Sequence, residues 1–222
     1  NRERQFSSDL AHELRTPIAE LKMMSEVALR WPEKKNDNYA LETLEISQQL
    51  QDTIETLLSL NRFENGQEKL KIEELCLKTV INECLKKHEK QISNKDIKVD
   101  IKVDEGKVID TDIGIFRTII NNLLSNAAEY TPQNGEIIIL GKSNSSDEIL
   151  RISNNVDGME FEMLEHLFER FWRADNSRSD SSHIGLGLSL SKACAEALSL
   201  KINASLCENA ETIQFSLNRT NS

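Results

Sequence analysis

No stretch of this sequence is apolar for long enough to cross a membrane. A bilayer span needs ~20 apolar residues, no run approaches that length, and nothing resembles a signal peptide. Clusters of basic residues are also lacking: the formal net charge is −10, and short lysine runs such as residues 86–87 are interleaved with glutamate. Phosphate backbones attract clustered lysine and arginine, so nucleic acid is not expected as a partner. These absences indicate an acidic, soluble chain.

The sequence also lacks the close-spaced cysteine pairs that bind metals. Its four cysteines are Cys76, Cys84, Cys194 and Cys207, and each sits among apolar neighbours. Buried free thiols are therefore expected, rather than a disulfide or a metal site.

Two long helices are predicted in the first third of the chain. Apolar residues recur at steps of three and four from residue 1 to about 31 and again from 39 to about 63. Residues 31–38 contain a proline and polar side chains, so the two helices should lie antiparallel around a short connection. A lone hairpin cannot cover its own apolar stripe, which predicts a homodimer with a four-helix bundle. The alternative is that the hairpin packs on the rest of its own chain.

Shorter segments follow residue 66 and predict a second domain. Helices are expected at 80–93, 113–129, 162–168 and 187–198, and strands at 97–103, 137–141, 149–154, 201–207 and 212–217. One mixed sheet with helices packed on it is a two-layer α/β sandwich. The predicted fold class is thus α+β, with residues 1–66 forming the helical domain and residues 67–222 the sandwich. The polar run 177–182 predicts a mobile loop.

Four residues of the first helix are spaced for one chemical task. At neutral pH much of His12 is uncharged imidazole, a nucleophile toward phosphorus, because its unperturbed pKa is ~6.5. Glu13 can hold the proton on the other ring nitrogen while a phosphoramidate forms. Thr16 lies one turn further along the same face, where its hydroxyl can orient a water. Pro17 removes a backbone hydrogen bond, so a kink is expected beside the reacting residue.

Residues 6–17 resemble the phosphoacceptor box of sensor histidine kinases of two-component systems, most closely the branch that includes heavy-metal sensors. The resemblance extends from residue 6 to about residue 217. It implies that His12 takes a phosphoryl group from ATP bound to a GHKL-type domain. It also implies transfer to an aspartate of a response regulator receiver domain that docks on the bundle. The full-length protein would be anchored in the inner membrane, with this part in the cytoplasm.

A second motif occupies residues 122–132. Asn122 and Asn126 are one turn apart on a predicted helix, and neutral oxygens so placed can complete a Mg²⁺ shell that keeps waters and substrate phosphates. The segment resembles the asparagine box of the same family, in which the second asparagine, here Asn126, holds Mg²⁺ and the tyrosine, here Tyr130, packs on the nucleotide. Glu129 departs from the family, which often has lysine or arginine there, and a carboxylate would repel phosphates.

The segment 152–159 resembles the first glycine box, whose aspartate accepts a hydrogen bond from adenine. In the register counted back from the next motif, Asn154 replaces that aspartate and Val156 replaces the first glycine. An asparagine carbonyl can still accept the bond, without the strength that a charge adds. Asp157, followed by Gly158, is the competing candidate if the loop register differs.

Two further motifs complete the predicted nucleotide site. Residues 167–173 resemble the phenylalanine box, whose last arginine, here Arg173, can reach the phosphates. Residues 185–192 resemble the second glycine box and open a helix with Gly185, Leu186, Gly187 and Leu188. Glycines let backbone N–H groups approach phosphate oxygens, and a helix N-terminus favours anions.

These motifs together predict an ATP-dependent protein-histidine kinase that autophosphorylates His12, with Mg²⁺ as cofactor, and that also acts as a response-regulator phosphatase. A degenerate signalling scaffold or phosphatase with little kinase activity is the alternative. Glu129, Asn154 and Val156 are the departures that motivate it.

Overall fold

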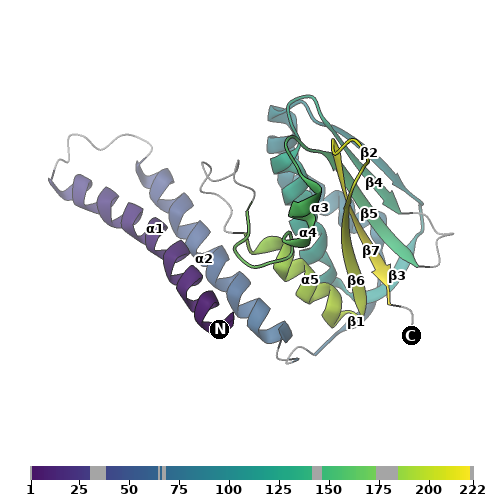
Figure 1. Cartoon of the computed structure of the whole chain (residues 1–222), viewed down its shortest axis with the longest axis horizontal. Helices are drawn as coiled ribbons and strands as arrows, with labels where there is room; N and C mark the ends of the chain where they lie inside the picture. The colour runs from purple at the N-terminus through teal and green to yellow at the C-terminus, as the bar shows by residue number, and fades with distance from the viewer. Residues whose placement is uncertain are drawn as a thin grey trace.

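The computed structural model describes residues 2–30, 39–64, 66, 69–141, 147–173 and 185–220, without the side chains of residues 2–9, 11–13 and 64. The chain begins with two helices, α1 (Arg2–Arg30) and α2 (Tyr39–Glu64). They form an antiparallel hairpin beside an α/β domain (Figure 1). The predicted helical hairpin is confirmed. Helix α1 continues through Pro17; the predicted kink stays a prediction.

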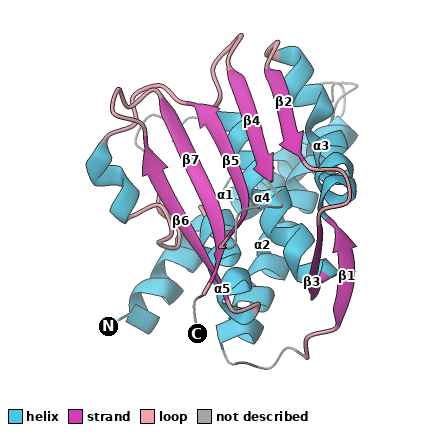
Figure 2. Ribbon diagram, turned by 90° about the vertical axis from the view of Figure 1, so that its right-hand side faces the viewer, coloured by secondary structure: helices cyan, strands magenta, loops and turns pink. Residues whose placement is uncertain are grey.

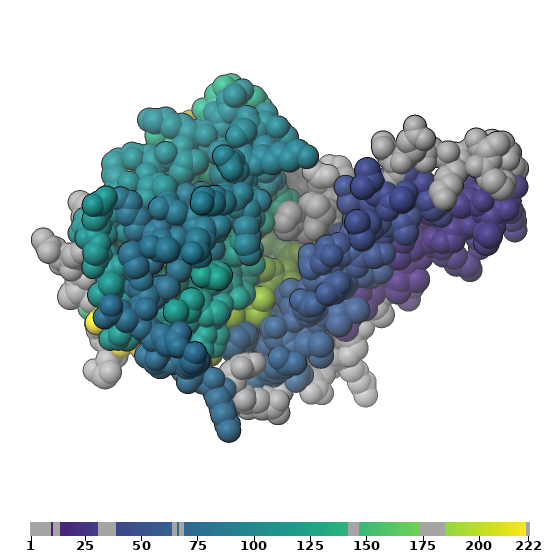
Figure 3. Space-filling model, turned by 180° about the vertical axis from the view of Figure 1, so that it is seen from behind, coloured from purple at the N-terminus to yellow at the C-terminus, as the bar shows by residue number. Residues whose placement is uncertain are grey.

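Several large apolar side chains in the described part of the hairpin are not covered by the chain itself. Figure 3 shows the hairpin, purple to blue, projecting from one side of the α/β domain. Large exposed apolar side chains occur on both helices: Ile18, Met23, Leu29, Leu41, Leu44, Ile54 and Leu58. The last turns of α2 are different, because they pack on helix α5 (Gly187–Ala197) of the α/β domain. Leu60 is only 1% exposed there, and Leu57 and Phe63 pack against the same core. One end of the hairpin therefore packs on its own chain, and the homodimer with a four-helix bundle stays a prediction.

The α/β domain is built on a five-stranded mixed sheet with the order β2-β4-β5-β7-β6. Its strands are β2 (Lys98–Val103), β4 (Glu136–Gly141), β5 (Glu148–Asn155), β6 (Leu200–Leu206) and β7 (Thr212–Arg219). Strands β2 and β4 pair parallel, and every other pair is antiparallel. The predicted mixed sheet is confirmed, and each strand agrees with its predicted bounds to within two residues.

Helices α3 (Leu77–Asn94), α4 (Ile113–Tyr130) and α5 cover one face of this sheet (Figure 2). Alternate residues of the central strands face the helices; Ile137, Ile139 and Ile152 are fully buried there. Phe116 of α4 is fully buried against the same layer. The two layers share one core, which confirms the α/β sandwich.

Two elements differ from the sequence prediction. Strands β1 (Ile72–Cys76) and β3 (Val108–Asp112) form a separate antiparallel ribbon that was not predicted. Both are short and half exposed, so their apolar alternation is weak. The predicted helix at 162–168 is a single 3-10 segment, η2 (Phe161–Glu165); turns follow it as far as Phe171, whose φ of +63° lies outside the helical region.

The thiols are free, as predicted, but they are not all buried. Cys84 and Cys194 are buried and Cys207 is intermediate, whereas Cys76 is exposed. The prediction was wrong for Cys76 because this residue ends the unpredicted strand β1 and points away from the core. Among the helices that the structure describes, none is both long and apolar enough to span a bilayer.

Asp112 links two segments through hydrogen bonds to its carboxylate: the segment that follows the hairpin and the first turn of α4. Its Oδ1 accepts from the backbone N–H of Ile115 at 3.1 Å, so it is the N-cap of α4. Its Oδ2 accepts from the backbone N–H of Lys71 at 2.9 Å, just before β1. The backbone N–H groups, that of Lys71 foremost, hold the pKa of Asp112 below its ordinary value of 3.8. One carboxylate therefore fixes both the first turn of α4 and the point where the linker enters the domain.

The lowered pKa of Asp112 makes a testable contribution to acid stability. A carboxylate whose folded pKa is depressed stabilises the fold above its unfolded pKa of about 4, and this contribution disappears as pH falls through the folded pKa. Asp112→Asn can keep the cap but turns an N–H toward one of the two donors, so it should lose about 1 kcal/mol at pH 7. Urea unfolding at pH 7, 4 and 3 measures the free energy of unfolding. As the pH falls below 4, this free energy should decrease less for the variant than for the wild type. Asp110→Asn, at an exposed position two residues earlier, is the control. If the free energy of unfolding depends on pH equally for Asp112→Asn and wild type, the assignment is contradicted.

Candidate nucleotide site

The C-terminal half of α4 and the first turn of α5 are joined side by side. The amide nitrogen Nδ2 of Asn122 donates to the carbonyl oxygen of Gly187 at 3.0 Å and to Oγ of Ser191 at 3.2 Å. Asn126 and Tyr130 follow on α4, one and two turns further toward its C-terminus. Two of the predicted motifs, distant in sequence, are thus in direct contact.

The N-terminus of α5 can bind an anion. The helix begins at Gly187, and its first backbone N–H groups have no acceptor within the helix. Gly187 lies beside Asn122: a Cβ on this glycine would lie 3.7 Å from the amide carbon of that side chain, which is an ordinary van der Waals contact. Partial positive charge at this end of the helix favours phosphate oxygens.

Gly185 connects this helix to the segment that carries Arg173. The backbone N–H of Phe171 donates to the carbonyl oxygen of Gly185 at 2.9 Å. Gly185 has φ +75°, and a Cβ there would lie 2.8 Å from the carbonyl oxygen of Trp172. Phe171 itself has φ +63°. The backbone of residues 171–172 therefore lies close to that of Gly185. Arg173, which is half-buried, follows directly in the chain.

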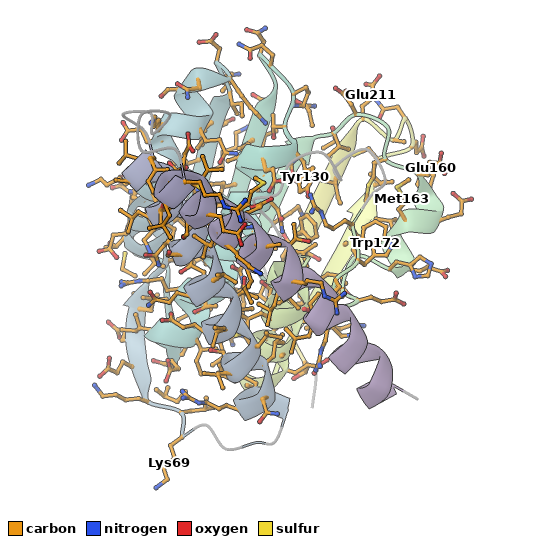
Figure 4. All side chains as sticks on the ribbon, turned by 90° about the vertical axis from the view of Figure 1, so that its left-hand side faces the viewer. Lys69, Tyr130, Glu160, Met163, Trp172 and Glu211 are labelled. Atoms are coloured by element: carbon orange, nitrogen blue, oxygen red, sulfur yellow. The ribbon has the colours of Figure 1, made fainter. Side chains whose placement is uncertain are left out.

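Aromatic side chains surround the same segment. Phe168 contacts Phe215 of β7 edge-on, with ring centroids 6.4 Å apart. Trp172 stacks on His166 at 6.3 Å, and Nδ1 of His166 lies 3.1 Å from Glu169. In Figure 4 Tyr130 and Trp172 both lie to the upper right of α1. The segment 168–173 thus contacts the sheet through Phe168, and it contacts Gly185, two residues before α5, through Phe171.

The end of β5 carries the two candidates for recognition of adenine. Asn154 is 2% exposed, and its Nδ2 donates to the carbonyl oxygen of Asn155 at 2.8 Å. Asn155, which the sequence reasoning did not single out, accepts from the backbone N–H of Glu136 at 2.7 Å. Asp157 is exposed, and Gly158 follows with φ +69°. Asn154 is buried and Asp157 is exposed, and neither position decides which residue accepts the hydrogen bond from adenine. Both assignments stay predictions.

Lys95 supports the C-terminal end of α4. Its ammonium group donates to the carbonyl oxygens of Ala128 at 3.2 Å and Thr131 at 3.1 Å, and also to that of Glu129. An ammonium has three N–H donors, and the three carbonyls lie in the last turn of α4 or just after it, since the helix ends at Tyr130. A cation at this end also complements the helix dipole. Sequence reasoning missed Lys95, because it lies in a turn far from the motif that it supports.

The phosphoacceptor residues lie on α1. Residues 12 and 13 fall within the helix, but their side chains are outside the described residues, so the roles of His12 and Glu13 stay predictions. Thr16 is exposed on this helix and Pro17 is buried, and the role of Thr16 stays a prediction. The predicted loop 177–182 also lies outside the described residues.

The described part of the chain thus has a two-domain architecture, a helical hairpin followed by an α/β sandwich, with a candidate nucleotide site where α4 meets α5. Residues 2–66 match the His Kinase A (phospho-acceptor) domain. Residues 111–220 match the histidine kinase-, DNA gyrase B- and HSP90-like ATPase domain. The chain therefore belongs to the sensor histidine kinases and comprises the catalytic core of that family.

Individual relatives agree with this assignment. The probable sensor protein PcoS of Escherichia coli is 34% identical over 196 residues, which are 86% of this chain and 41% of PcoS. The histidine kinase AdeS of Acinetobacter baumannii has the same fold, with a TM-score of 0.79, 24% identity, and coverage of 94% of this chain and 97% of AdeS. Histidine kinase ThkA, crystallised in complex with the response regulator protein TrrA, gives a TM-score of 0.69 at 23% identity, covering 99% of this chain and 64% of ThkA. The chain spans between 22% and 51% of the length of the curated relatives that it matches.

Proposed function

We propose that the chain transfers the γ-phosphoryl group of ATP to His12 and that the group then passes to an aspartate of a response regulator. The observation that carries the proposal is the junction of α4 and α5, where Asn122 contacts Gly187 at the start of an anion-binding helix. This places an amide-rich helix face beside the backbone N–H groups expected to receive phosphates. A phosphoacceptor hairpin in the same chain supplies the destination.

The donors present fit Mg²⁺. This ion prefers oxygen ligands and commonly keeps waters and substrate phosphates, so one or two protein ligands suffice. Asn126 is assigned to hold the ion, which would neutralise charge on the phosphates. Within the described part of the chain, no group of three or more His, Cys, Asp and Glu residues could hold a metal. Asparagine oxygens with phosphate oxygens are thus the donor set that the site offers.

The chain's own residues would act mainly by positioning. The first turn of α5 and Arg173 would bind the phosphates, and the imidazole of His12 would be brought in line with the γ-phosphorus. A new N–P bond forms between the imidazole and the γ-phosphorus. The bond between that phosphorus and the β–γ bridging oxygen of ATP breaks, and ADP leaves. Glu13 would hold the proton on the other ring nitrogen.

Several finer assignments are part of the same proposal. The boundary between the domains is placed after residue 66, between the end of α2 and the start of β1. Exposed apolar residues of the hairpin would form the homodimer bundle, and the regulator would dock on that bundle. The full-length protein would be membrane-anchored, with this part facing the cytoplasm. The segment around His12 supports membership of the heavy-metal sensor branch.

Labelled ATP tests the proposal directly. The wild-type chain with Mg²⁺ should incorporate the γ-phosphoryl group, and EDTA should prevent it. The label should be lost in dilute acid, because a phosphoramidate N–P bond is labile there and a serine or threonine ester is not. Nucleotide binding without any acid-labile label would instead favour the scaffold alternative.

A further inference from the structure

Ser191 is a fully buried hydroxyl at the contact between α4 and α5. It lies one turn after Gly187 and is 0% exposed. Its Oγ accepts from Nδ2 of Asn122 and donates to the carbonyl oxygen of Gly187 at 2.9 Å. A buried hydroxyl adds little to apolar packing, so the role of Ser191 has to be found in these bonds.

The side chains of Asn122 and Ser191 and the carbonyl of Gly187 form a closed hydrogen-bond network. Only one placement of the protons satisfies it. The carbonyl of Gly187 can only accept, so both Asn122 and Ser191 must donate to it. Once the hydroxyl proton of Ser191 is used in this way, its lone pairs remain to face Asn122. The Asn122 amide must therefore turn its nitrogen, and not its oxygen, toward both partners.

The network fixes where the oxygen of Asn122 lies. Because Nδ2 is held against α5, Oδ1 occupies the other branch of the amide plane. We propose that Ser191 is a positioning residue that locks the Asn122 amide and so presents its oxygen to the magnesium ion of the bound Mg-ATP, beside Asn126. This inference rests on the proposed Mg-ATP site. Ser191 itself touches neither the nucleotide nor the metal.

Removal of the hydroxyl has a specific consequence. In Ser191→Ala the amide keeps the carbonyl of Gly187 as its acceptor but loses the second one, so its rotation is less restricted. Alanine is a strong helix former, and α5 should stay folded. The effect should therefore appear in nucleotide binding when Mg²⁺ is present, more than in stability.

Ser189 provides a matched control in the same helix. It is also buried, and its Oγ donates to the carbonyl oxygen of Leu186 at 2.8 Å. Ser189→Ala thus removes an equivalent buried serine-to-backbone bond without touching Asn122. Any general cost of such a bond to α5 should be the same in both variants.

Calorimetry with a non-hydrolysable ATP analogue tests the inference. In Mg²⁺, Ser191→Ala should raise the Kd about tenfold, the value of one hydrogen bond, and Ser189→Ala should stay within about twofold of wild type. In EDTA, the difference between Ser191→Ala and wild type should shrink to about twofold or less, because the amide oxygen then has no cation to meet. Ser191→Thr, which keeps the hydroxyl, should restore most of the affinity in Mg²⁺.

The inference is overturned if Ser191→Ala and Ser189→Ala raise the Kd equally, or if the loss for Ser191→Ala persists unchanged in EDTA. Either result would make Ser191 an ordinary structural residue. Should the wild-type chain itself bind no nucleotide in Mg²⁺, the proposed function fails first. The two failures are therefore separate.

Discussion

Replacement of His12 by alanine is expected to reduce phosphoryl incorporation from labelled ATP to background, a fall of at least about 10³-fold. Alanine has no atom that can form the N–P bond, and no neighbouring side chain substitutes for a lost nucleophile. The affinity for Mg-ATP should stay near that of the wild type, since the nucleotide site lies on the α/β domain. Labelling and calorimetry on the same preparation measure both quantities.

His88→Ala is the matched control for this experiment. His88 is a half-buried histidine on α3, and its Nε2 lies 3.3 Å from Oδ1 of Asn121 on α4, outside the proposed machinery. Labelling of this variant should stay within about twofold of wild type, in keeping with the small effect of most substitutions away from functional groups. Acid-labile label that survives in His12→Ala would place the acceptor elsewhere and overturn the assignment.

Substitution of Gly185 by alanine is expected to lower the free energy of unfolding by about 3 kcal/mol. The cost has two parts: φ +75° disfavours any side chain, and the new Cβ would lie 2.8 Å from the carbonyl oxygen of Trp172 and 2.9 Å from the carbonyl carbon of Phe171. All of these contacts are with backbone, which cannot move aside as a flexible side chain can. The hydrogen bond from Phe171 to Gly185 should be lost, and nucleotide affinity should fall with it. Urea unfolding and calorimetry provide the measurements.

Gly106→Ala separates the cost of the positive φ from the cost of the steric contact. Gly106 has φ +83°, but a Cβ there would meet nothing within 4 Å. This variant should cost only about 1 kcal/mol, from the left-handed backbone alone. If Gly185→Ala is no more destabilising than Gly106→Ala, the contact between Gly185 and Trp172 is not important for the fold.

Long periodic segments of the chain could be predicted from sequence, because their signal is repeated over many residues. Helices α1, α2 and α4 and all strands of the main sheet were identified in this way. The glycine pair at residues 185 and 187 predicted the start of a helix, and the structure places it against Asn122 as the motifs require. Local pattern and tertiary contact agree in these elements.

The parts that could not be predicted depend on contacts between distant residues. The ribbon of β1 and β3 is short and half exposed, so only its partner strand defines it. Lys95 and Asn155 act on backbone groups more than 15 residues away, with no local signal. Ser191 had one weak signal, a polar residue one turn after Gly187 in an apolar helix. Its meaning appeared only with the position of Asn122.

The hydrogen bond from Lys71 to Asp112 sets the length of the tether between the two domains. Seven Cα steps separate Glu64 from Lys71 (71 − 64), so a fully extended connection reaches at most about 25 Å. Counting back along the antiparallel hairpin, residue 12 is level with about residue 57 of α2, because 30 − 12 equals 57 − 39. That level is seven residues before Glu64, a rise of about 10 Å along the helix axis. In the proposed transfer, the α/β domain would reach residue 12 by rotating about this short connection at the end of α2, and a longer connection should lower the effective concentration of the domain near that residue.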